Sequence, residues 1–475
     1  MIKFKDYEKF GIAEVSTSKY HNIHLKKIAR YIFYSKLKFI YKVPPLLAKI
    51  QVQIARKIGG LEDALRTGEI EISKLQSELP NSIDKIAIQE KIRQYKTNIS
   101  IHKHLIKEWR WVADGIVWRF LEYKREKIRL LSENANTGYL NFLTVGFKNE
   151  LTSFIELSTF SWKKALLSDI TNCLRTGDII VRHSEKQFEI LEVKSSSVSD
   201  SKKKNRPRLE RQEERIRKIT QVLDTGIVEA QKGKIVFVNC DVPLGSFLEE
   251  VASLIQETKS GKCAVVKKLD KVISVVVHNY HRAITLLPKN ATEKDIDKLK
   301  ELMDVDIPKF KNKERIMCVS NFDHFNQKNG EFMRLVPPYT IYPFSANVCS
   351  EIISGKILIT TWIDLEALKE VFIENGWDVE EIANQKLGEE IRKLKQAKQN
   401  NQERYKVISD DTIFILRKNG REVHFPLSIL IRMGYEFITT ETMLKVAEYI
   451  STIQHRTDDI YGSIIEFSNE SSLWE

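Results

Sequence analysis

A single apolar stripe with helical spacing runs through residues 82–124 and constrains the fold more than any other feature of the sequence. Such heptad spacing is typical of one long amphipathic helix, or of two helices with a bend at Gly115. The stripe has to be covered, either by a neighbouring helix of the same chain or by a second subunit. Its members alternate in steps of four and three residues: Ile88, Ile92, Tyr95, Ile99, His102, Ile106, Trp109, Ala113, Ile116, Phe120 and Tyr123.

The choice of cover separates two predictions about the oligomeric state. Cover by a second subunit predicts a homodimer through residues 82–124, and Trp109 and Phe120 are large enough to anchor such an interface. Cover within the chain predicts that residues 1–60 or the C-terminal part lie on the stripe. The sequence leaves both open.

Beyond the stripe, segments with helical and with strand periodicity alternate. Residues 141–175 read as helical, whereas 233–240 and 271–280 read as strands separated by a helix. Strands that alternate with helices predict an α/β domain with a mixed sheet. After about residue 290 the pattern becomes α+β. We therefore expect three parts: a helical, basic N-terminal region over 1–104, an α/β domain over 105–285 and an α+β C-terminal domain over 286–475.

Two short apolar runs in "GDIIVRHSEKQFEILEVKSSS" (177–197) predict a β-hairpin with its turn near 183–187. Asp178 opens the first strand. Glu192 and Lys194 close the second strand on one face, since residues two apart in a strand share a face. The start of one hairpin strand lies beside the end of the other, so we expect these three side chains to converge. The second strand is apolar on both faces, as is typical of a central strand.

Two carboxylates and one ammonium group at one strand edge can support metal-dependent hydrolysis. Mg²⁺ prefers oxygen ligands and usually keeps several waters and substrate phosphate oxygens. Asp178 and Glu192, with the Val193 carbonyl, could bind Mg²⁺, and Mn²⁺ is expected to substitute for it. Lys194 could orient or deprotonate the attacking water. The alternative is a surface hairpin with a cross-strand ion pair, although a buried carboxylate without a partner is costly.

This arrangement resembles the PD-(D/E)xK nuclease superfamily, which has the restriction-endonuclease-like fold. The resemblance covers residues 105–245 approximately, and "DGIVWR" (114–119) and "DITNCLRTGD" (169–178) look like parts of uncharacterised bacterial proteins with this domain. Gly177 stands where the name of the pattern has proline. The superfamily often adds an acid from the preceding helix. Glu150 and Glu156 are the candidates for it, and Glu150 is taken as the further metal ligand.

The resemblance implies a restriction-endonuclease-like α/β core with a mixed sheet, and a Mg²⁺-dependent endonuclease that prefers DNA to RNA. Because the fold is used most often in restriction, repair and phage defence, a role in bacterial anti-phage defence and a partner defence protein are expectations from family habit. The alternative is a nucleic-acid-binding or regulatory protein with a nuclease-like scaffold, active only within a complex, since fold alone does not decide function.

A highly charged helix is predicted at 207–223, shortly after the hairpin. In the superfamily a helix in this place lines the catalytic cleft, so Gln212 joins the expected catalytic set. The arginines of the same face, together with Lys203 and Lys204, are expected to bind the nucleic-acid backbone. The alternative is a solvated helix with ion pairs between successive turns. The face is formed by positions i, i+3, i+4 and i+7: Arg208, Arg211, Gln212 and Arg215.

Positive charge is concentrated at the N-terminus. Residues 1–57 contain 13 lysines and arginines against three acids, so this segment carries +10 of the formal +12 of the chain. Aromatic residues interleave the basic ones in "HLKKIARYIFYSKLKFIYK". Such a segment can follow phosphates and stack on bases, lie on an anionic membrane, or form an amphipathic helix whose lysines extend over a core. All three interpretations stay open.

Cysteine usage and hydropathy bear on the compartment. The five cysteines form no CxxC pair, which disfavours a disulfide framework or a zinc cluster and is typical of a reducing cytoplasm. The N-terminal sequence has no secretory signal, and no run of about 18 apolar residues is present to span a bilayer. We therefore expect a cytoplasmic protein without a transmembrane segment.

Overall fold

The computed structural model of the chain forms two compact units. Unit 1 is Met1–Gly226 together with Pro337–Lys356, and unit 2 is Ile227–Val336 together with Ile357–Glu475. The predicted boundaries at 104/105 and 285/286 do not coincide with this division. The residues that the structure describes are 18–132, 145–174, 176–183, 187–193, 213–214, 216–222, 225, 227–230, 233–286, 293–305, 310, 312, 315–321, 336–381, 412–453, 460–467 and 470–474.

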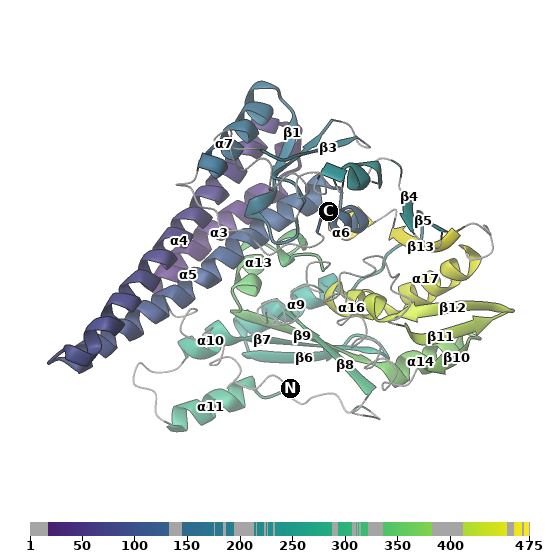
Figure 1. The fold of residues 1–475 in the computed structure, drawn as a ribbon. Helices are drawn as coiled ribbons and strands as arrows, with labels where there is room; N and C mark the ends of the chain where they lie inside the picture. Colours follow the sequence, from purple (N-terminus) through teal and green to yellow (C-terminus); the bar gives the residue numbers. More distant parts are fainter. Residues whose placement is uncertain are drawn as a thin grey trace. The chain divides into compact units, whose positions relative to one another are not determined.

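Two long helices, α4 (Pro44–Glu78) and α5 (Lys85–Phe120), form the frame of unit 1 (Figure 1). The predicted long helix is confirmed, and it continues through Gly115 without a break. α4 packs along α5, so that a Cβ atom on Gly68 would lie 3.2 Å from Ile99 Cγ1. The apolar stripe is therefore covered within the chain, and the seam that could have paired two subunits joins two helices of one chain.

A distant part of the chain completes unit 1. The segment Pro337–Lys356 carries η8 (Tyr339–Ile341) and α13 (Ala346–Ile353). Lys36, the last residue of α3 (Lys19–Lys36), donates hydrogen bonds from Nζ to the carbonyl oxygens of Tyr342 at 2.5 Å and Phe344 at 2.6 Å. Burial lowers the pKa of Lys36. This ammonium group thus fastens α3 to a segment about 300 residues away in sequence.

The sheet of unit 1 is an antiparallel meander in the order β1-β2-β3. The predicted hairpin is confirmed, with Ile179 of β2 opposite Leu191 of β3. Two expectations are wrong. β3 lies at an edge of the described sheet rather than in its centre, and residues 164–167 form a strand inside a segment expected to be helical. The strands are β1 (Lys164–Leu167), β2 (Ile179–Arg182) and β3 (Phe188–Leu191).

Short helical elements surround this sheet and connect the long helices. α7 precedes β1 along the chain, and a π-helical turn, η3, extends it. η4 follows β1 directly and leads toward the start of β2. The elements are η1 (Lys38–Lys42), η2 (Leu79–Asn81), α6 (Arg125–Leu131), α7 (Val145–Ile155), η3 (Glu156–Phe160) and η4 (Ser168–Ile170).

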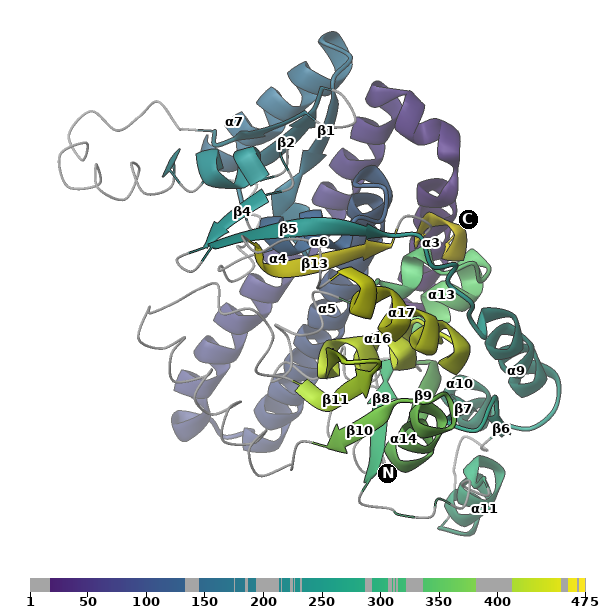
Figure 2. The same ribbon diagram turned by 90° about the vertical axis from the view of Figure 1, so that its right-hand side faces the viewer.

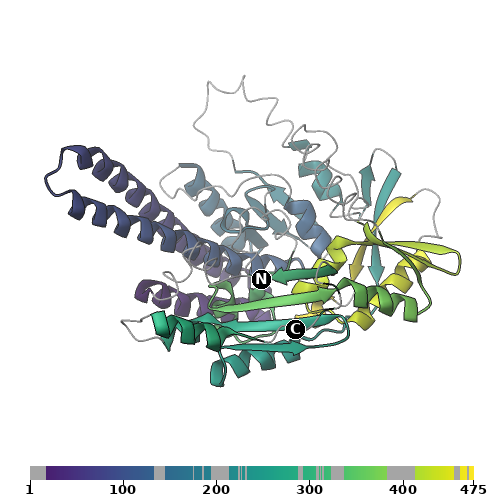
Figure 3. The ribbon, with the colours of Figure 1, turned by 90° about the horizontal axis from the view of Figure 1, so that it is seen from below.

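The described strands of unit 2 form three sheets. Strands β6-β7-β9-β8 form an antiparallel sheet, seen from below in Figure 3, and β10-β11-β12 form a second one. The third sheet, β13-β5-β4, is mixed, because β13 runs parallel to β5 and β4 antiparallel to it (Figure 2). The mixed sheet therefore combines strands from the predicted α/β segment with a strand from the C-terminal end.

Helices follow or connect most of these strands. None of the helices in the described part of the chain combines the length and the apolar character needed to cross a membrane. The elements of unit 2 are β4 (Ile227–Ala230), β5 (Gly233–Cys240), α9 (Leu248–Ser260), β6 (Ala264–Lys268), β7 (Ile273–Asn279), α10 (Tyr280–Thr285), α11 (Glu293–Met303), β8 (Ile316–Ser320), β9 (Ile357–Asp364), α14 (Leu365–Glu374), β10 (Asp378–Glu381), β11 (Thr412–Lys418), β12 (Arg421–Pro426), α16 (Leu427–Tyr435), α17 (Thr440–Ile453), β13 (Ile460–Phe467) and η10 (Glu470–Leu473).

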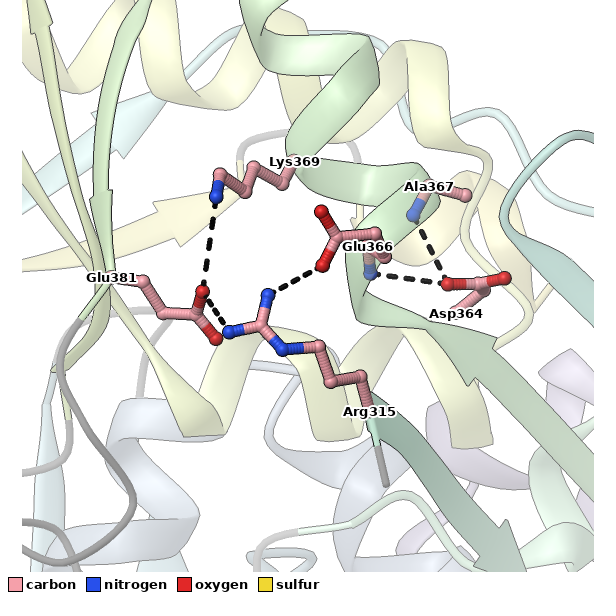
Figure 4. Close-up of polar contacts among 6 residues, drawn as sticks. All are labelled: Arg315, Asp364, Glu366, Ala367, Lys369 and Glu381. Atoms are coloured by element: carbon pink, nitrogen blue, oxygen red, sulfur yellow. Dashed lines mark hydrogen bonds and ion pairs between the residues drawn. The ribbon is translucent and has the colours of Figure 1, made fainter. Parts of the chain in front are cut away.

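An ion-pair network joins β8, α14 and β10 at the surface of unit 2 (Figure 4). Arg315 lies 2.5 Å from the Glu366 carboxylate and also contacts Glu381. The Nζ atom of Lys369 approaches Glu381 to 4.0 Å. Asp364 caps α14 by accepting hydrogen bonds from backbone N–H groups of the first turn. Because its charges are matched with one another, we assign this network to holding α14 beside the sheet.

Candidate active site

Asp178 lies directly before β2, where hydrogen bonds from the ends of β1 and β3 hold it. Its N–H donates to the Leu191 carbonyl at 2.9 Å, and its carbonyl accepts from the Ser168 N–H at 2.9 Å. The side chain accepts a 2.7 Å hydrogen bond from the Val193 N–H. Burial raises the pKa of Asp178, the Val193 hydrogen bond opposes this, and the charge of Asp169 raises it further. The carboxyl group is thus fixed where the three strands meet.

Gly177 supplies the backbone turn that brings Asp178 to this place. Its φ is +71°, a region that residues with a side chain rarely adopt. A Cβ atom would also collide with Cγ2 of Ile190. Proline, with φ fixed near about −65°, cannot adopt this conformation. This turn therefore requires glycine at position 177, where the name of the superfamily pattern has proline.

Four carboxyl groups interact electrostatically near the end of the hairpin, since the charges of Asp169 (η4), Asp178 and Glu192 act on Glu150 of α7. Of the four, Glu150 is buried and Glu192 is exposed. Glu150 is only 6 % exposed, and its Oε1 atom has no hydrogen-bond partner. Burial, followed by the charges of Asp169, Asp178 and Glu192, raises the pKa of Glu150 to about 9. At neutral pH, without a cation in the cluster, Glu150 therefore carries a proton.

Three of these four residues were predicted from the sequence, and one was not. Asp178 is hydrogen-bonded to the residue after Glu192, and the charges of both act on Glu150. The structure separates the two candidates for the third acid, because Glu156 is exposed one and a half turns later and is not among the charges that act on Glu150. Asp169 was missed, although the quoted segment "DITNCLRTGD" begins with it.

Several predicted residues lie outside the described part of the chain. Lys194 follows Val193 directly, but its own position is not described. The described part of the charged helix is residues 213–214 and 216–222, where Glu214 pairs with Arg217 at 2.6 Å and with Lys218 at 3.3 Å. These are ion pairs of the kind that the solvated-helix alternative expects. The other residues outside are Gln212, Arg208, Arg211, Arg215, Lys203 and Lys204.

A buried glutamine of α4 extends the hydrogen bonding of the sheet. Gln51 is 1 % exposed and lies beside the free edge of β1. Its Nε2 donates to the Ala165 carbonyl at 3.0 Å, and its Oε1 accepts from the Leu167 N–H at 2.9 Å. The side-chain amide thus pairs with β1 as a neighbouring strand would, and it fixes the sheet to the long helices.

Two charged residues of α5 hold the loop that leads to Asp178. Buried Asp114 accepts hydrogen bonds from the N–H groups of Asn172 at 2.7 Å and Cys173 at 3.0 Å. Burial raises the pKa of Asp114, and these hydrogen bonds oppose the rise. Arg110 donates to the Thr171 carbonyl at 3.2 Å. The segments "DGIVWR" and "DITNCLRTGD", which the sequence singled out separately, are therefore in direct contact.

The chemistry of the cluster fits a hard divalent cation. Carboxylate oxygens are the ligands that Mg²⁺ prefers, and the unpartnered Oε1 of Glu150 is a buried oxygen without a hydrogen bond to lose. Within the described residues, no group of three or more histidine, cysteine, aspartate or glutamate side chains is arranged to hold a metal ion. Mg²⁺ needs no such group, because one or two carboxylates with waters and substrate phosphates usually bind it.

Comparison with known proteins adds no family to this picture. No protein-family model, no curated protein and no solved structure matches the chain. The resemblance to the PD-(D/E)xK superfamily therefore rests on the residues of the hairpin and on their local geometry.

Proposed function

We propose that the chain is a metal-dependent nuclease that hydrolyses phosphodiester bonds of nucleic acid, with DNA as the preferred substrate. One observation carries this proposal: the Val193 N–H, next to Glu192, holds the side chain of Asp178 at 2.7 Å. The charges of both acids act on the buried Glu150 carboxyl, whose Oε1 has no hydrogen-bond partner. The buried Glu150 carboxyl costs folding free energy when it ionises, because it loses hydration and lies near other acidic charges. Costs of this kind are typical of sites that bind cations or perform catalysis.

The residues have distinct proposed roles. Asp178, Glu192 and the Val193 carbonyl would hold Mg²⁺ or Mn²⁺, with Glu150 as a further ligand. The ion would polarise the scissile phosphate and stabilise the charge that develops on it. The Val193 N–H holds the Asp178 carboxylate in place before any substrate arrives. Lys194 is assigned to the water whose oxygen attacks phosphorus while the bond from phosphorus to the leaving sugar oxygen breaks.

The proposal extends to fold and biological context. Strands β1–β3 with α7 would be part of a restriction-endonuclease-like core, and Gln212 would assist catalysis from the charged helix. A cytoplasmic role in anti-phage defence or restriction follows from the same resemblance. The side chains proposed to bind the nucleic-acid backbone are Arg208, Arg211, Arg215, Lys203 and Lys204.

Cleavage assays test the proposal directly. Purified protein is incubated with plasmid, single-stranded DNA and RNA, in Mg²⁺ or in EDTA. We expect the wild-type protein to cleave in Mg²⁺ but not in EDTA. Glu192→Gln should not cleave in either condition. Glu189→Gln is the matched control, because Glu189 lies on β3 three residues before Glu192 but pairs with His183 at 2.7 Å. If Glu192→Gln cleaved at the wild-type rate, the end of the hairpin would not be the catalytic site. Nucleic-acid binding without cleavage of any substrate would favour the scaffold alternative.

A further inference from the structure

The helix α3, labelled in Figure 1, and η1 belong to unit 1 and carry many basic residues. No aspartate or glutamate occurs between Ser18 and Leu61, whereas the same stretch contains ten lysines and arginines. Six of these basic side chains are exposed on α3 and η1: Lys19, Lys26, Lys27, Arg30, Lys38 and Lys42. An uninterrupted positive surface of this kind attracts polyanions.

Exposed aromatic rings are interleaved with these charges. Tyr20 is 46 % exposed, Phe33 53 %, Tyr34 39 % and Phe39 52 %. Exposed aromatic rings keep apolar surface in contact with water, and a partner that covers this surface gains favourable free energy. The α3 face is defined here as these four rings together with the six basic residues.

The helical spacing places the α3 part of this face on the side of the helix that points away from the core. Lys19, Lys26, Arg30 and Phe33 follow one another at intervals of three, four or seven residues, which keeps them on one side of the helix. The apolar side of α3 faces inward, where Leu25 is 6 % exposed and Ile28 and Ile32 are fully buried. A helix that lies in a membrane surface needs its apolar side for lipid. In α3 that side is used for packing.

The residues around His24, which lies on the same helix, also form a positively charged environment. The pKa of His24 is lowered to about 4, first by burial and then by the positive charges of Lys27, Lys57, His21 and His102. The nearby acid Glu108 is buried and lies 2.8 Å from His21, so its charge is matched inside the protein. Between Ser18 and Leu61 no acidic side chain offsets the positive charge on the outer side of α3.

We infer that the α3 face binds single-stranded nucleic acid, with its basic side chains along the phosphates and its aromatic rings stacked on unpaired bases. Base stacking on aromatic side chains combined with a basic track is how proteins hold single strands without reading their sequence. In a duplex the base faces are already stacked on one another, so the rings would find no partner there. The inference goes beyond the proposed cleavage and does not depend on it.

Binding in EDTA tests the inference apart from any cleavage. Fluorescence anisotropy with labelled oligothymidylate of about 20 nucleotides, and with a duplex of the same length, measures Kd for the full chain at several salt concentrations. Lys26→Glu/Arg30→Glu should weaken single-strand binding about tenfold or more, and should reduce the slope of log K against log salt by about 1.4, since two phosphate contacts are lost. Phe33→Ala/Tyr34→Ala should weaken it about tenfold without changing the slope.

The matched control is Lys91→Glu/Lys96→Glu, which changes the net charge equally at two exposed positions of α5. Equal loss of binding in the control and in Lys26→Glu/Arg30→Glu would overturn the inference, because net charge alone would then explain it. Wild-type binding by Phe33→Ala/Tyr34→Ala would also overturn it. Co-sedimentation with phosphatidylserine vesicles that depends on the α3 face, without oligonucleotide binding, would assign the face to a membrane. Since EDTA is present throughout, a failed nuclease proposal leaves these outcomes unchanged.

Discussion

The backbone N–H of Val193 donates a 2.7 Å hydrogen bond to the side chain of Asp178, so the second residue after β3 holds the acid directly before β2. Asp178→Asn keeps an oxygen that can accept this bond, whereas Asp178→Ala removes it. We expect both variants to lose Mg²⁺-dependent cleavage. Asp178→Ala should in addition unfold about 1 kcal/mol more easily than Asp178→Asn, the contribution of a typical hydrogen bond. Thermal unfolding in EDTA measures this difference, and equal midpoints would show that the bond does not hold the hairpin.

Replacing the buried Glu150 carboxyl should stabilise the protein, whereas Asp178→Ala should destabilise it. The pKa of Glu150 is raised from 4.5 to about 9 in the folded chain, so the wild-type protein loses stability as pH rises from 4.5 toward 9. Glu150→Gln cannot ionise. We therefore expect it to raise the free energy of unfolding by about 1 to 3 kcal/mol at pH 8 in EDTA, while abolishing cleavage.

The exposed Glu156 provides the matched control for this prediction. Glu156→Gln should change neither the free energy of unfolding nor cleavage, because its carboxylate is hydrated. Urea titrations at pH 6 and pH 8 show whether the gain in Glu150→Gln grows with pH. A gain that is the same at both values, or a loss, would contradict the burial argument.

The turn at Gly177 can be tested against a glycine in an unstrained position. Gly177→Ala combines a positive φ with a collision against Ile190, which together cost about 2 to 4 kcal/mol. Gly60→Ala lies within α4, where nothing lies within 4 Å of the new Cβ atom, and it should stabilise the protein by about 0.5 to 1 kcal/mol. Urea unfolding curves should show shifts of opposite sign.

His278 in unit 2 should lower the free energy of unfolding in acid. Burial lowers the pKa of His278 from 6.5 to about 4. The unfolded chain therefore takes up a proton at higher pH than the folded chain, and the stability present above pH 6.5 is lost as the pH falls toward 4. His278→Gln should remove about 1 to 2 kcal/mol of the loss between pH 7 and pH 5. Urea unfolding curves of the wild type and of His278→Gln at pH 7 and pH 5 measure this difference.

Strong periodicities were the parts of the fold that the sequence could predict. The heptad stripe predicted α5 over nearly its full length, and two apolar runs predicted the hairpin of β2 and β3. Both patterns follow from which side chains must be buried. Asp178 and Glu192 could be placed beside each other for the same reason, since a hairpin register relates the start of one strand to the end of the next.

The remaining features depend on packing between distant segments. Gly59 and Gly60 have low helix propensity, yet α4 continues through both as a helix of 35 residues, because packing against α5 outweighs that propensity. β1 has four residues and no alternation long enough to detect, and its edge is paired by the side chain of Gln51. Asp169 follows this strand, so it could not be placed in the cluster before β1 was known.

The late segment Pro337–Lys356 makes unit 1 discontinuous, and this has a consequence for the order of events on the ribosome. Ile227–Val336, which belongs to unit 2, is translated between the two pieces of unit 1. At about 5 to 20 residues per second, its 110 residues take roughly 6 to 22 seconds to synthesise. During that interval Lys36 lacks the carbonyl groups that it binds in the finished protein. In the nascent chain α3 therefore lacks these hydrogen bonds during that interval. Any nuclease activity that needs a complete unit 1 begins only after most of the polypeptide has been made.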